Sequence, residues 1–346
     1  MTLSDVRPSV EAAPIDRDLI ISSLQGALRA KDAAAELGRA LAHDIDRIYF
    51  VACGAPNRVM LGFEYWLDHA RTDLQVKRYF PAEFLALAPH LDERTLVVLA
   101  SKSGTTQETV QAAQFLRDQP CRTLVVTTTA DKPLAQGADH LFLMGETEQA
   151  HTGVYIVLQG FVAGLLDGRH GYPLYGAVMS SLDALPAVLV ESAEVSDARG
   201  RADAHTYRDD HTLYHLASGP VYTTAYVFGV CMLMEMQWLH SVPFEAAEWF
   251  HGPFEILDAQ TPVMVLLGED PSRPLAERAL TFCQKYTSRL MVYDARDLPM
   301  TGVAPEVRAL FAPYALQAAL NRFAEHLAAE RNHSLDTRRY MWVTEY

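Results

Sequence analysis

Short aliphatic and β-branched runs alternate with stretches of helical periodicity along this chain, and this alternation limits its possible folds most. Runs of this kind are typical of strands buried on both faces. In the first half we place strands at 46–52, 74–79, 95–100, 122–128 and 140–144, and helices near 57–70, 106–118 and 149–166. Alternating strands and helices predict a parallel sheet with helices on both faces.

The second half repeats this pattern without a clear sequence repeat. Its expected strands are 211–217, 263–268 and 289–294, its expected helices lie near 273–286 and 314–331, and another helix is expected over 181–195. We therefore predict an α/β protein with two doubly wound, flavodoxin-like parallel sheets. The expected parts are an N-terminal tail (1–20), a first domain (21–170), a linker helix (171–205) and a second domain (206–346).

Composition narrows the class of partner. The chain has 346 residues, enough for two domains, and 49% hydrophobic with 21% charged residues is typical of globular proteins. A net charge of −14 argues against nucleic acid and anionic membranes as partners. No run approaches the ~20 apolar residues of a spanning helix, and residues 1–18 lack the apolar core of a signal peptide.

The cysteines indicate a reducing compartment. They are widely scattered in apolar runs, and they form no Cys-x-x-Cys motif and no Cys/His spacing typical of metal ligands. We expect free thiols, no metal site and a cytoplasmic location. The four residues are Cys53, Cys121, Cys231 and Cys283.

A hydroxyl-rich loop joins the expected strand 95–100 to the next helix. It carries Ser101, Ser103 and Thr106 around the flexible Gly104. Hydroxyls beside the free N–H groups of a helix start make a site for a phosphate dianion. The spacing of a nucleotide P-loop and the glycine pattern of a dinucleotide fold are both missing. The alternative is an ordinary helix cap.

Lys102 projects from the same loop. It could steer anionic groups of a substrate toward the hydroxyls, but a lysine in this position more commonly faces solvent. The loop alone therefore indicates an anion site without defining its ligand.

Glu235 and His251 are the candidate acid–base pair. Glu235 lies near the end of an apolar run, 221–238, that reads as a helix buried on most sides. Burial raises a carboxyl pKa, which suits a general base near neutral pH. His251 precedes a Gly-Pro chain break, where an imidazole can reach a cleft. Each residue could instead be structural. His240 is interpreted as structural, on another face of the Glu235 helix, and His211 and His215 as packing residues.

The loop Ser101-Lys-Ser-Gly-Thr-Thr106 after a strand, followed later by Glu235 and the turn Phe250-His-Gly-Pro253, resembles the sugar isomerase (SIS) domain proteins. Further similarity covers Asp46–Gly54, the segment 234–258 and the tail 337–346. More narrowly, the chain resembles the deglycases that cleave 6-phosphorylated fructosyl amino acids, which are phosphorylated Amadori compounds. The segment 234–258 and the tail are most similar to deglycases of 6-phosphofructose-aspartate, and next to those of fructoselysine 6-phosphate.

This resemblance implies two SIS domains and an enzyme without a cofactor. Glu235 is the implied base and His251 the implied acid, and the loop is expected to hold the 6-phosphate. The expected contacts to substrate or phosphate come from Ser101, Lys102, Ser103, Gly104, Thr106, Gly54, Glu248 and Arg339. The implied reaction gives glucose 6-phosphate and a free amino acid through an enaminol.

Two departures from the family pattern are visible. Ala55 and Pro56 follow Gly54, where relatives often place a hydroxyl. Relatives that make glucosamine 6-phosphate carry a glutaminase domain and a C-terminal lysine; this chain shows neither, which argues against an aminotransferase. Two alternatives stay open. One is an aldose–ketose phosphosugar isomerase, and the other is a SIS module that only senses a phosphosugar.

The family resemblance also implies a homodimer with shared active sites, in which the histidine of the His-Gly-Pro turn enters the partner's site. Trp249, Phe250 and Phe254 flank His251, and three large aromatic residues around an exposed loop suit an interface. The aromatic tail 340–346 also needs a covering surface. The alternative is that both segments pack within their own subunit.

Overall fold

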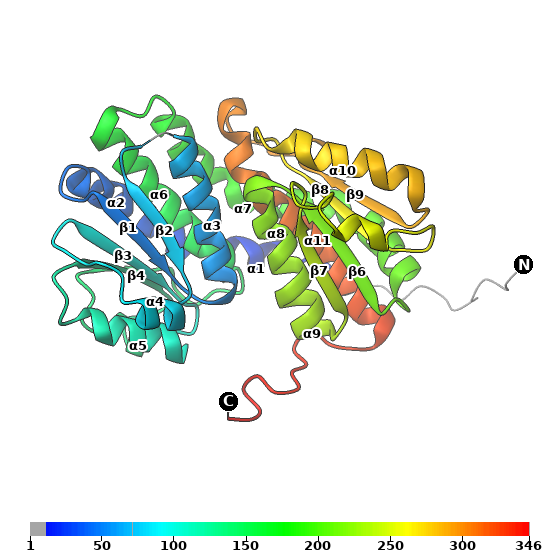
Figure 1. The fold of residues 1–346 in the computed structure, drawn as a ribbon, viewed down its shortest axis with the longest axis horizontal. Coiled ribbons are helices and arrows are strands. Elements are labelled where there is room, and N and C mark those ends of the chain that lie inside the picture. Colours follow the sequence, from blue (N-terminus) through cyan, green and yellow to red (C-terminus); the bar gives the residue numbers. More distant parts are fainter. Residues whose placement is uncertain (1–11, 71, 346) are drawn as a thin grey trace, which may run out of the picture. The chain divides into compact units, whose positions relative to one another are not determined.

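The structure is a computed structural model that describes residues 12–70 and 72–345 (Figure 1). It divides into two compact units, which we describe separately. The N-terminal unit comprises residues 16–187 and 301–308, and the C-terminal unit comprises the described residues before 16 together with 188–300 and those from 309 onward. Residues 301–308 return to the N-terminal unit, where Ala304 N–H donates to Ser181 Oγ at 3.0 Å.

The N-terminal unit contains one parallel sheet in the order β2-β1-β3-β4-β5. This order is flavodoxin-like, and its direction reverses between β1 and β3. Ligands of such sheets bind beyond the carboxyl ends of the strands at that reversal. The strands are β1 (Arg47–Val51), β2 (Gln75–Tyr79), β3 (Thr95–Ala100), β4 (Arg122–Thr127) and β5 (His140–Leu143).

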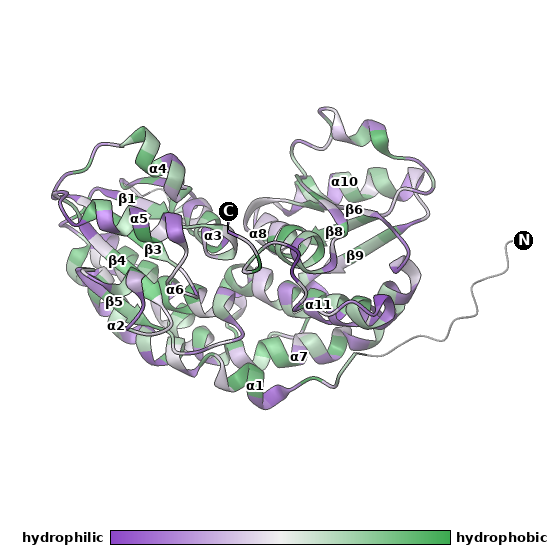
Figure 2. Ribbon diagram, turned by 90° about the horizontal axis from the view of Figure 1, so that it is seen from below, coloured by the Kyte–Doolittle hydropathy of each residue, from purple (hydrophilic) through white to green (hydrophobic). Residues whose placement is uncertain are grey.

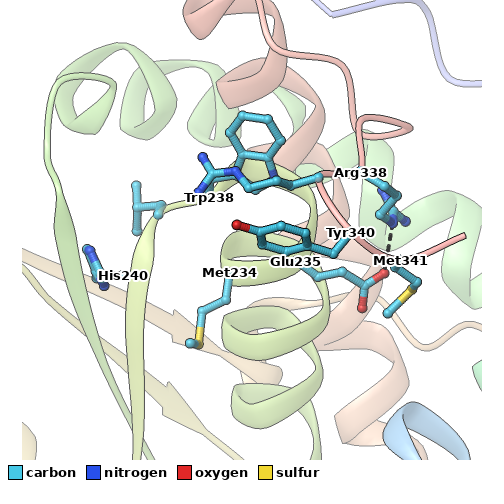
Figure 3. A pocket seen from close by; sticks show the side chains of 9 residues that line it. Met234, Glu235, Trp238, His240, Arg338, Tyr340 and Met341 are labelled. Atoms are coloured by element: carbon cyan, nitrogen blue, oxygen red, sulfur yellow. Dashed lines mark ion pairs between the residues drawn. The ribbon is translucent and has the colours of Figure 1, made fainter. Parts of the chain in front are cut away.

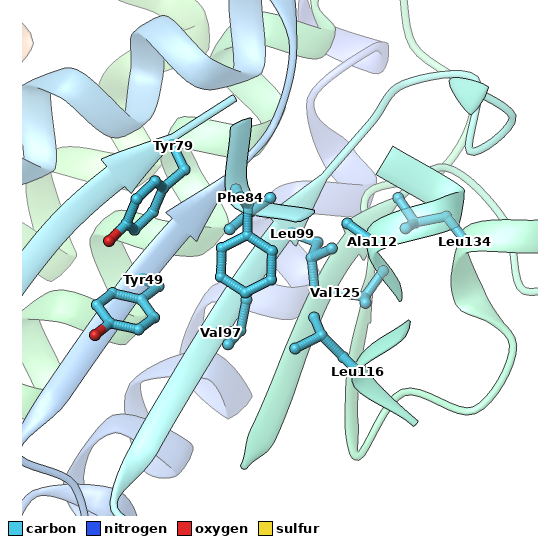
Figure 4. Close-up of a cluster of buried hydrophobic side chains, with 10 residues drawn as sticks. Tyr49, Tyr79, Phe84, Val97, Leu99, Ala112, Leu116, Val125 and Leu134 are labelled. Carbon is cyan, nitrogen blue, oxygen red and sulfur yellow. The ribbon is translucent and has the colours of Figure 1, made fainter. Parts of the chain in front are cut away.

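Helices cover both faces of this sheet. Tyr49, Val97 and Leu99 point to one face, where they pack with Phe84 of α4 and Leu116 of α5 (Figure 4). Alternate strand residues point to the other face, where Phe50 stacks on Phe63 of α3 and Phe63 stacks on Tyr155 of α6. The helices are α1 (Arg17–Ser22), α2 (Gln25–Leu41), α3 (Gly54–His69), α4 (Pro81–Leu87), α5 (Gln107–Leu116) and α6 (Ala150–His170).

The C-terminal unit contains a second parallel sheet in the order β7-β6-β8-β9. One face packs on α10 and on Trp249, and the other carries His215 against Phe228. Its elements are β6 (Thr212–Ala217), α8 (Tyr222–Tyr226), the π-helical segment η3 (Val227–Met234), α9 (Glu235–Gln237), β7 (His240–Glu245), β8 (Val263–Leu267), α10 (Arg273–Tyr286), β9 (Leu290–Asp294) and α11 (Arg308–Arg331).

Helix α7 (Tyr175–Tyr207) is longer than the predicted segment 181–195 and crosses from one unit to the other along the chain. By length and hydropathy alone it is the one helix of the described residues that could span a membrane, although 61% of its most apolar window is buried. Figure 2 shows hydrophobic and hydrophilic residues mixed along the helices, as expected for helices with one buried side.

All eight predicted strands are present, and the predicted α/β class with two parallel sheets is confirmed. Strand β7 and helices α1, α2 and α4 were not predicted. β7 contains Pro243, which argues against a strand, but β7 is an edge strand and a proline is tolerated there. The predicted helix 221–238 is helical over most of its length, but its centre is a π-helix.

Helices α2 and α6 pack with their backbones in direct contact because three glycines lack side chains. A Cβ on Gly164 would lie 1.9 Å from the Ala35 carbonyl oxygen, and one on Gly38 would lie 2.2 Å from that of Phe161. A Cβ on Gly160 would lie 2.5 Å from the Lys31 carbonyl oxygen. The obstructing atoms are backbone, so a larger residue would have to separate the helices.

Replacing Gly164 with alanine should therefore lower the free energy of unfolding by about 1–3 kcal/mol or more, the usual cost of overpacking. Gly176→Ala is the matched control, because Gly176 also lies in a helix and a Cβ there meets nothing within 4 Å. That control should gain up to about 1 kcal/mol from helix propensity. Urea unfolding curves of the two variants test this, and equal midpoints would contradict the packing argument.

Candidate active site

The loop after β3 gathers its hydroxyl groups around Ser101. Ser101 Oγ lies 2.9 Å from Thr106 Oγ1 and 3.3 Å from Ser103 Oγ. Gly104 has φ +62° and donates its N–H to Ser101 Oγ at 3.1 Å. Helix α5 begins directly after Thr106, so the free N–H groups of its first turn belong to the same loop. Hydroxyls beside a helix N-terminus can bind a phosphate dianion.

Gly54 lies at the same edge of the sheet. It is the first residue of α3, has φ +56°, and follows β1, which pairs with β3. Thr109 Oγ1 on α5 lies 3.9 Å from Cys53 Sγ, so the starts of α3 and α5 are adjacent. The structure therefore brings Gly54 and the hydroxyl loop together at the reversal of strand order.

Lys102 points away from the loop hydroxyls toward solvent. Its ammonium group pairs with Glu148 at 3.3 Å, and both side chains are largely exposed. An exposed ion pair is worth little, so Lys102 could leave Glu148 at small cost. Its contact with substrate stays a prediction.

Glu235 is half-buried at the end of the π-helical segment and forms an ion pair that the sequence did not reveal. Its Oε1 lies 3.1 Å from Nε of Arg338, whose side chain is only 10% exposed. Burial raises the pKa of Glu235, and the Arg338 guanidinium opposes that rise. The carboxyl group thus has the raised pKa expected of a general base. The neighbouring Arg338 cation limits that rise.

Beside Glu235 lies a pocket of about 660 Å³ within the C-terminal unit (Figure 3). Arg339 lies over the ring of Trp238, with its guanidinium carbon 4.1 Å from the ring centre. Trp238 has φ +52° and ends α9, which turns the chain into β7. The pocket is lined by Met234, Glu235, Trp238, Leu239, His240, Arg338, Arg339, Tyr340 and Met341.

His240 lies elsewhere than predicted. It is the exposed first residue of β7, not a residue on another face of the Glu235 helix, and it lines the pocket. The helix ends earlier because Trp238 adopts a left-handed conformation, and the Leu239 N–H then closes the turn onto the Leu233 carbonyl oxygen at 3.0 Å.

His251 is exposed in the turn after β7 and does not line the pocket of Glu235. The Glu248 carbonyl oxygen accepts the His251 N–H at 3.0 Å, so this residue shapes the turn through its backbone. The interface argument from Trp249 is wrong, because Trp249 is fully buried in the core of its own unit. Phe250 and Phe254 pack against the same core.

The second sheet reverses its strand order between β6 and β8, but acidic groups occupy that edge. Burial raises the pKa of Glu245 to about 7, and the nearby Asp270 carboxylate acts in the same direction. Asp270 is buried and accepts both the N–H and the hydroxyl of Ser272, at 2.9 and 2.5 Å. Two carboxyl groups make this edge unsuited to an anion. Glu245 carries no local sequence signal of this position, which follows from the place of β7 in the sheet.

Metal-binding clusters and disulfide bonds are both absent among the described residues. The described ranges 12–70 and 72–345 contain no cluster of three or more His, Cys, Asp or Glu side chains placed to hold a metal ion. All four cysteines are free thiols.

Replacing Arg338 with glutamine should raise the pKa of Glu235 further, because Arg338 is the cation that opposes the effect of burial. The pKa can be read from an NMR titration of glutamate-labelled protein, with the signal assigned by its loss in Glu235→Gln. Arg339→Gln is the control, since Arg339 contacts Trp238 and not Glu235. An unchanged or lower pKa in Arg338→Gln would show that the ion pair does not act on this carboxyl group.

Known proteins share the sequence of this region and of most of the chain. The SIS domain family matches residues 42–166, which include Gly54 and the hydroxyl loop. A fructosamine deglycase of Bacillus subtilis is 39% identical over 305 residues, covering 87% of this chain and 93% of the relative. An agropine synthesis conjugase of Rhizobium rhizogenes is 32% identical over 316 residues, covering 88% of each chain.

The fold has a close solved counterpart. A structure from Bacillus subtilis, described as a candidate phosphosugar isomerase, superposes with a TM-score of 0.86 at 36% identity and covers 92% of this chain and 99% of its own. Sequence and fold agree over nearly the whole length. The chain belongs to the SIS domain family.

Proposed function

We propose that this protein is a deglycase that cleaves a 6-phosphorylated fructosyl amino acid to glucose 6-phosphate and the free amino acid. The observation that carries the proposal is Glu235, a carboxylate of raised pKa held by Arg338 in a pocket of about 660 Å³. The hydroxyl loop around Ser101 supplies a phosphate site, and the 39% identical relative from Bacillus subtilis is named a fructosamine deglycase.

The proposed reaction consists of three proton transfers and a hydrolysis. The open-chain substrate has a ketone at C2 and an amine on C1. Glu235 removes a proton from C1 while His251 donates a proton to the C2 oxygen, giving an enaminol. Protonation at C2 then gives an imine at C1, and water hydrolyses it to the aldose phosphate and the amine. Positioned acid–base groups contribute roughly 10²- to 10⁴-fold each.

The pocket beside Glu235 favours an amino acid with extra negative charge as the leaving group. Among the described residues no carboxylate pairs with Arg339, whose contact is the ring of Trp238. A guanidinium on an aromatic platform is well placed to bind a carboxylate. We therefore propose 6-phosphofructose-aspartate as substrate, with Arg339 as the contact to its added carboxylate. Glu248 lies in the turn before His251, outside this pocket lining, and we keep it as a proposed contact to the sugar. The lysine part of fructoselysine 6-phosphate carries one carboxylate and one ammonium group, so it offers this cation less negative charge than the two carboxylates of aspartate.

One observation favours a second candidate reaction: the structural counterpart is described as a candidate phosphosugar isomerase. An aldose–ketose isomerase would use the same proton transfers without releasing an amino acid. Assays that follow glucose 6-phosphate and the free amino acid separately, in both directions of reaction, distinguish these functions.

Phosphate recognition predicts the outcome of a direct assay. The protein should release glucose 6-phosphate from 6-phosphofructose-aspartate faster than from fructoselysine 6-phosphate, and it should act poorly on unphosphorylated compounds. Ser103→Ala should raise KM roughly 10- to 100-fold with little change in kcat, because it loses one hydrogen bond to a charged group. Ser180→Ala, which removes an exposed hydroxyl bonded only to its own helix, is the control.

The test of this assignment uses the unphosphorylated substrate again. Ser103→Ala and the unaltered protein should have the same low kcat/KM on it, because neither has a phosphate to bind. Equal activity of the unaltered protein on phosphorylated and unphosphorylated compounds would exclude the hydroxyl loop as the phosphate site.

We further propose a homodimer in which His251 completes the partner's site. Two observations support it: His251 is exposed and lies outside its own pocket lining, and the tail exposes Tyr340, Trp342 and Val343 by 65–78%. Exposed aromatic groups of this size are typical of a surface that another chain covers.

Glu235→Gln and His251→Ala should each abolish turnover without loss of fold, because each removes one proton-transfer group. Mixtures of the two inactive proteins, after subunit exchange, should regain part of the activity, since some mixed dimers contain one intact site. Circular dichroism controls for folding. A monomer in light scattering, or exchanged mixtures that stay inactive, would contradict the shared site.

A further inference from the structure

The helix that ends at Glu235 is built in an unusual way. Residues Val227–Met234 form a π-helix, and the N–H of Glu235 points to the carbonyl oxygens of Met232 and Val230, three and five residues earlier. π-helical turns are rare and are frequent at functional sites. In an α-helix each residue turns about 100°, so the change from a π to an α register would rotate Glu235 away from Arg338 by about that angle.

One residue of the π-helix touches the sheet with its backbone. A Cβ built on Gly229 would lie 2.5 Å from Ser241 Oγ on β7 and 3.2 Å from His215 Cδ2 on β6. Phe228, the preceding residue, is fully buried between His215 and Phe323, with ring centres 5.5 and 5.7 Å away. The π-helix can therefore pack this closely on β6 and β7 because residue 229 has no side chain.

The two side chains under Gly229 are polar groups whose hydrogen-bonding capacity is unused. His215 and Ser241 are buried, at 0% and 5% exposure, and neither the ring nitrogens nor the hydroxyl finds a partner among the described residues. Buried polar groups of this kind cost stability. Burial also keeps His215 neutral, because it lowers the pKa to about 3. Costly packing at one contact point is typical of a functional constraint.

We infer that Gly229 is a positioning residue for the reaction: its contact with Ser241 and His215 holds the π-helical register that turns Glu235 toward Arg338 and the pocket. The inference rests on the proposed role of Glu235 as the base. It concerns a residue that is itself part of neither the pocket lining nor the hydroxyl loop.

The direct test is a steric change with its own rescue. Gly229→Ala places a methyl group 2.5 Å from Ser241 Oγ, which is too close, so the helix or the Ser241 side chain must shift. We expect kcat to fall on the order of 10- to 100-fold with little change in KM, because a misplaced base costs rate and not binding. Gly229→Ala/Ser241→Ala should recover most of kcat, since removal of Oγ leaves the 3.2 Å approach to His215 as the nearest contact.

A pH profile separates positioning from simple loss of stability. If Glu235 turns away from Arg338, the acidic limb of kcat/KM should shift to higher pH in Gly229→Ala, because the cation that lowers the pKa of this carboxyl is lost. The double variant should return toward the original profile. Gly176→Ala, in an open helical position, should change none of these quantities.

The outcomes distinguish this inference from the proposed function. If the unaltered protein releases no amino acid from any phosphorylated fructosyl compound, the proposed function is wrong, and a crystal structure of Gly229→Ala still tests the register. If the unaltered protein is active while Gly229→Ala keeps its kcat and pH profile, the positioning inference is wrong. A Gly229→Ala defect that Ser241→Ala fails to relieve would also overturn it.

Discussion

Parallel pairing is the constraint on which the rest of this structure depends. Because every strand of a parallel sheet runs in one direction, all carboxyl ends meet at one edge, and the loops leaving adjacent strands become neighbours. In the N-terminal unit this brings Gly54, after β1, beside the loop Ser101–Thr106, after β3. Two helix starts and three hydroxyls therefore share this edge.

Both sheets are parallel, but they present different polar groups at the carboxyl ends of their strands. At the reversal of strand order the N-terminal unit presents hydroxyls and N–H groups, whereas the C-terminal unit presents Asp270 and Glu245. Hydroxyl and N–H donors favour an anion, whereas carboxylates disfavour one. The C-terminal unit instead presents Glu235 on a helix that follows β6, next to the tail residues Arg338 and Arg339. With two sheets of similar architecture, one unit can present groups suited to anion binding and the other a carboxyl group suited to proton transfer.

Much of this arrangement could be predicted from the sequence because it depends on local patterns. Buried aliphatic runs such as 95–100 and 263–267 have few conformational alternatives, so their strands were placed to within one or two residues. The hydroxyl loop is also local. By contrast, Arg338 and Arg339 are equivalent in sequence, and only the fold decides that Arg338 meets Glu235 while Arg339 meets Trp238. Pro243 concealed β7, because its position at an edge depends on the whole sheet.

The π-helical register before Glu235 is the feature that is hardest to predict from the sequence. The run 227–234 has the composition of an ordinary buried helix. Its residues show no local preference for the i to i+5 hydrogen bonds of a π-helix over the i to i+4 hydrogen bonds of an α-helix. What separates them is a contact with strands twelve residues later and fourteen residues earlier, where Ser241 and His215 meet Gly229. If Gly229 has the role that we infer, the direction of Glu235 toward its pocket depends on sheet packing through a residue that carries no functional group.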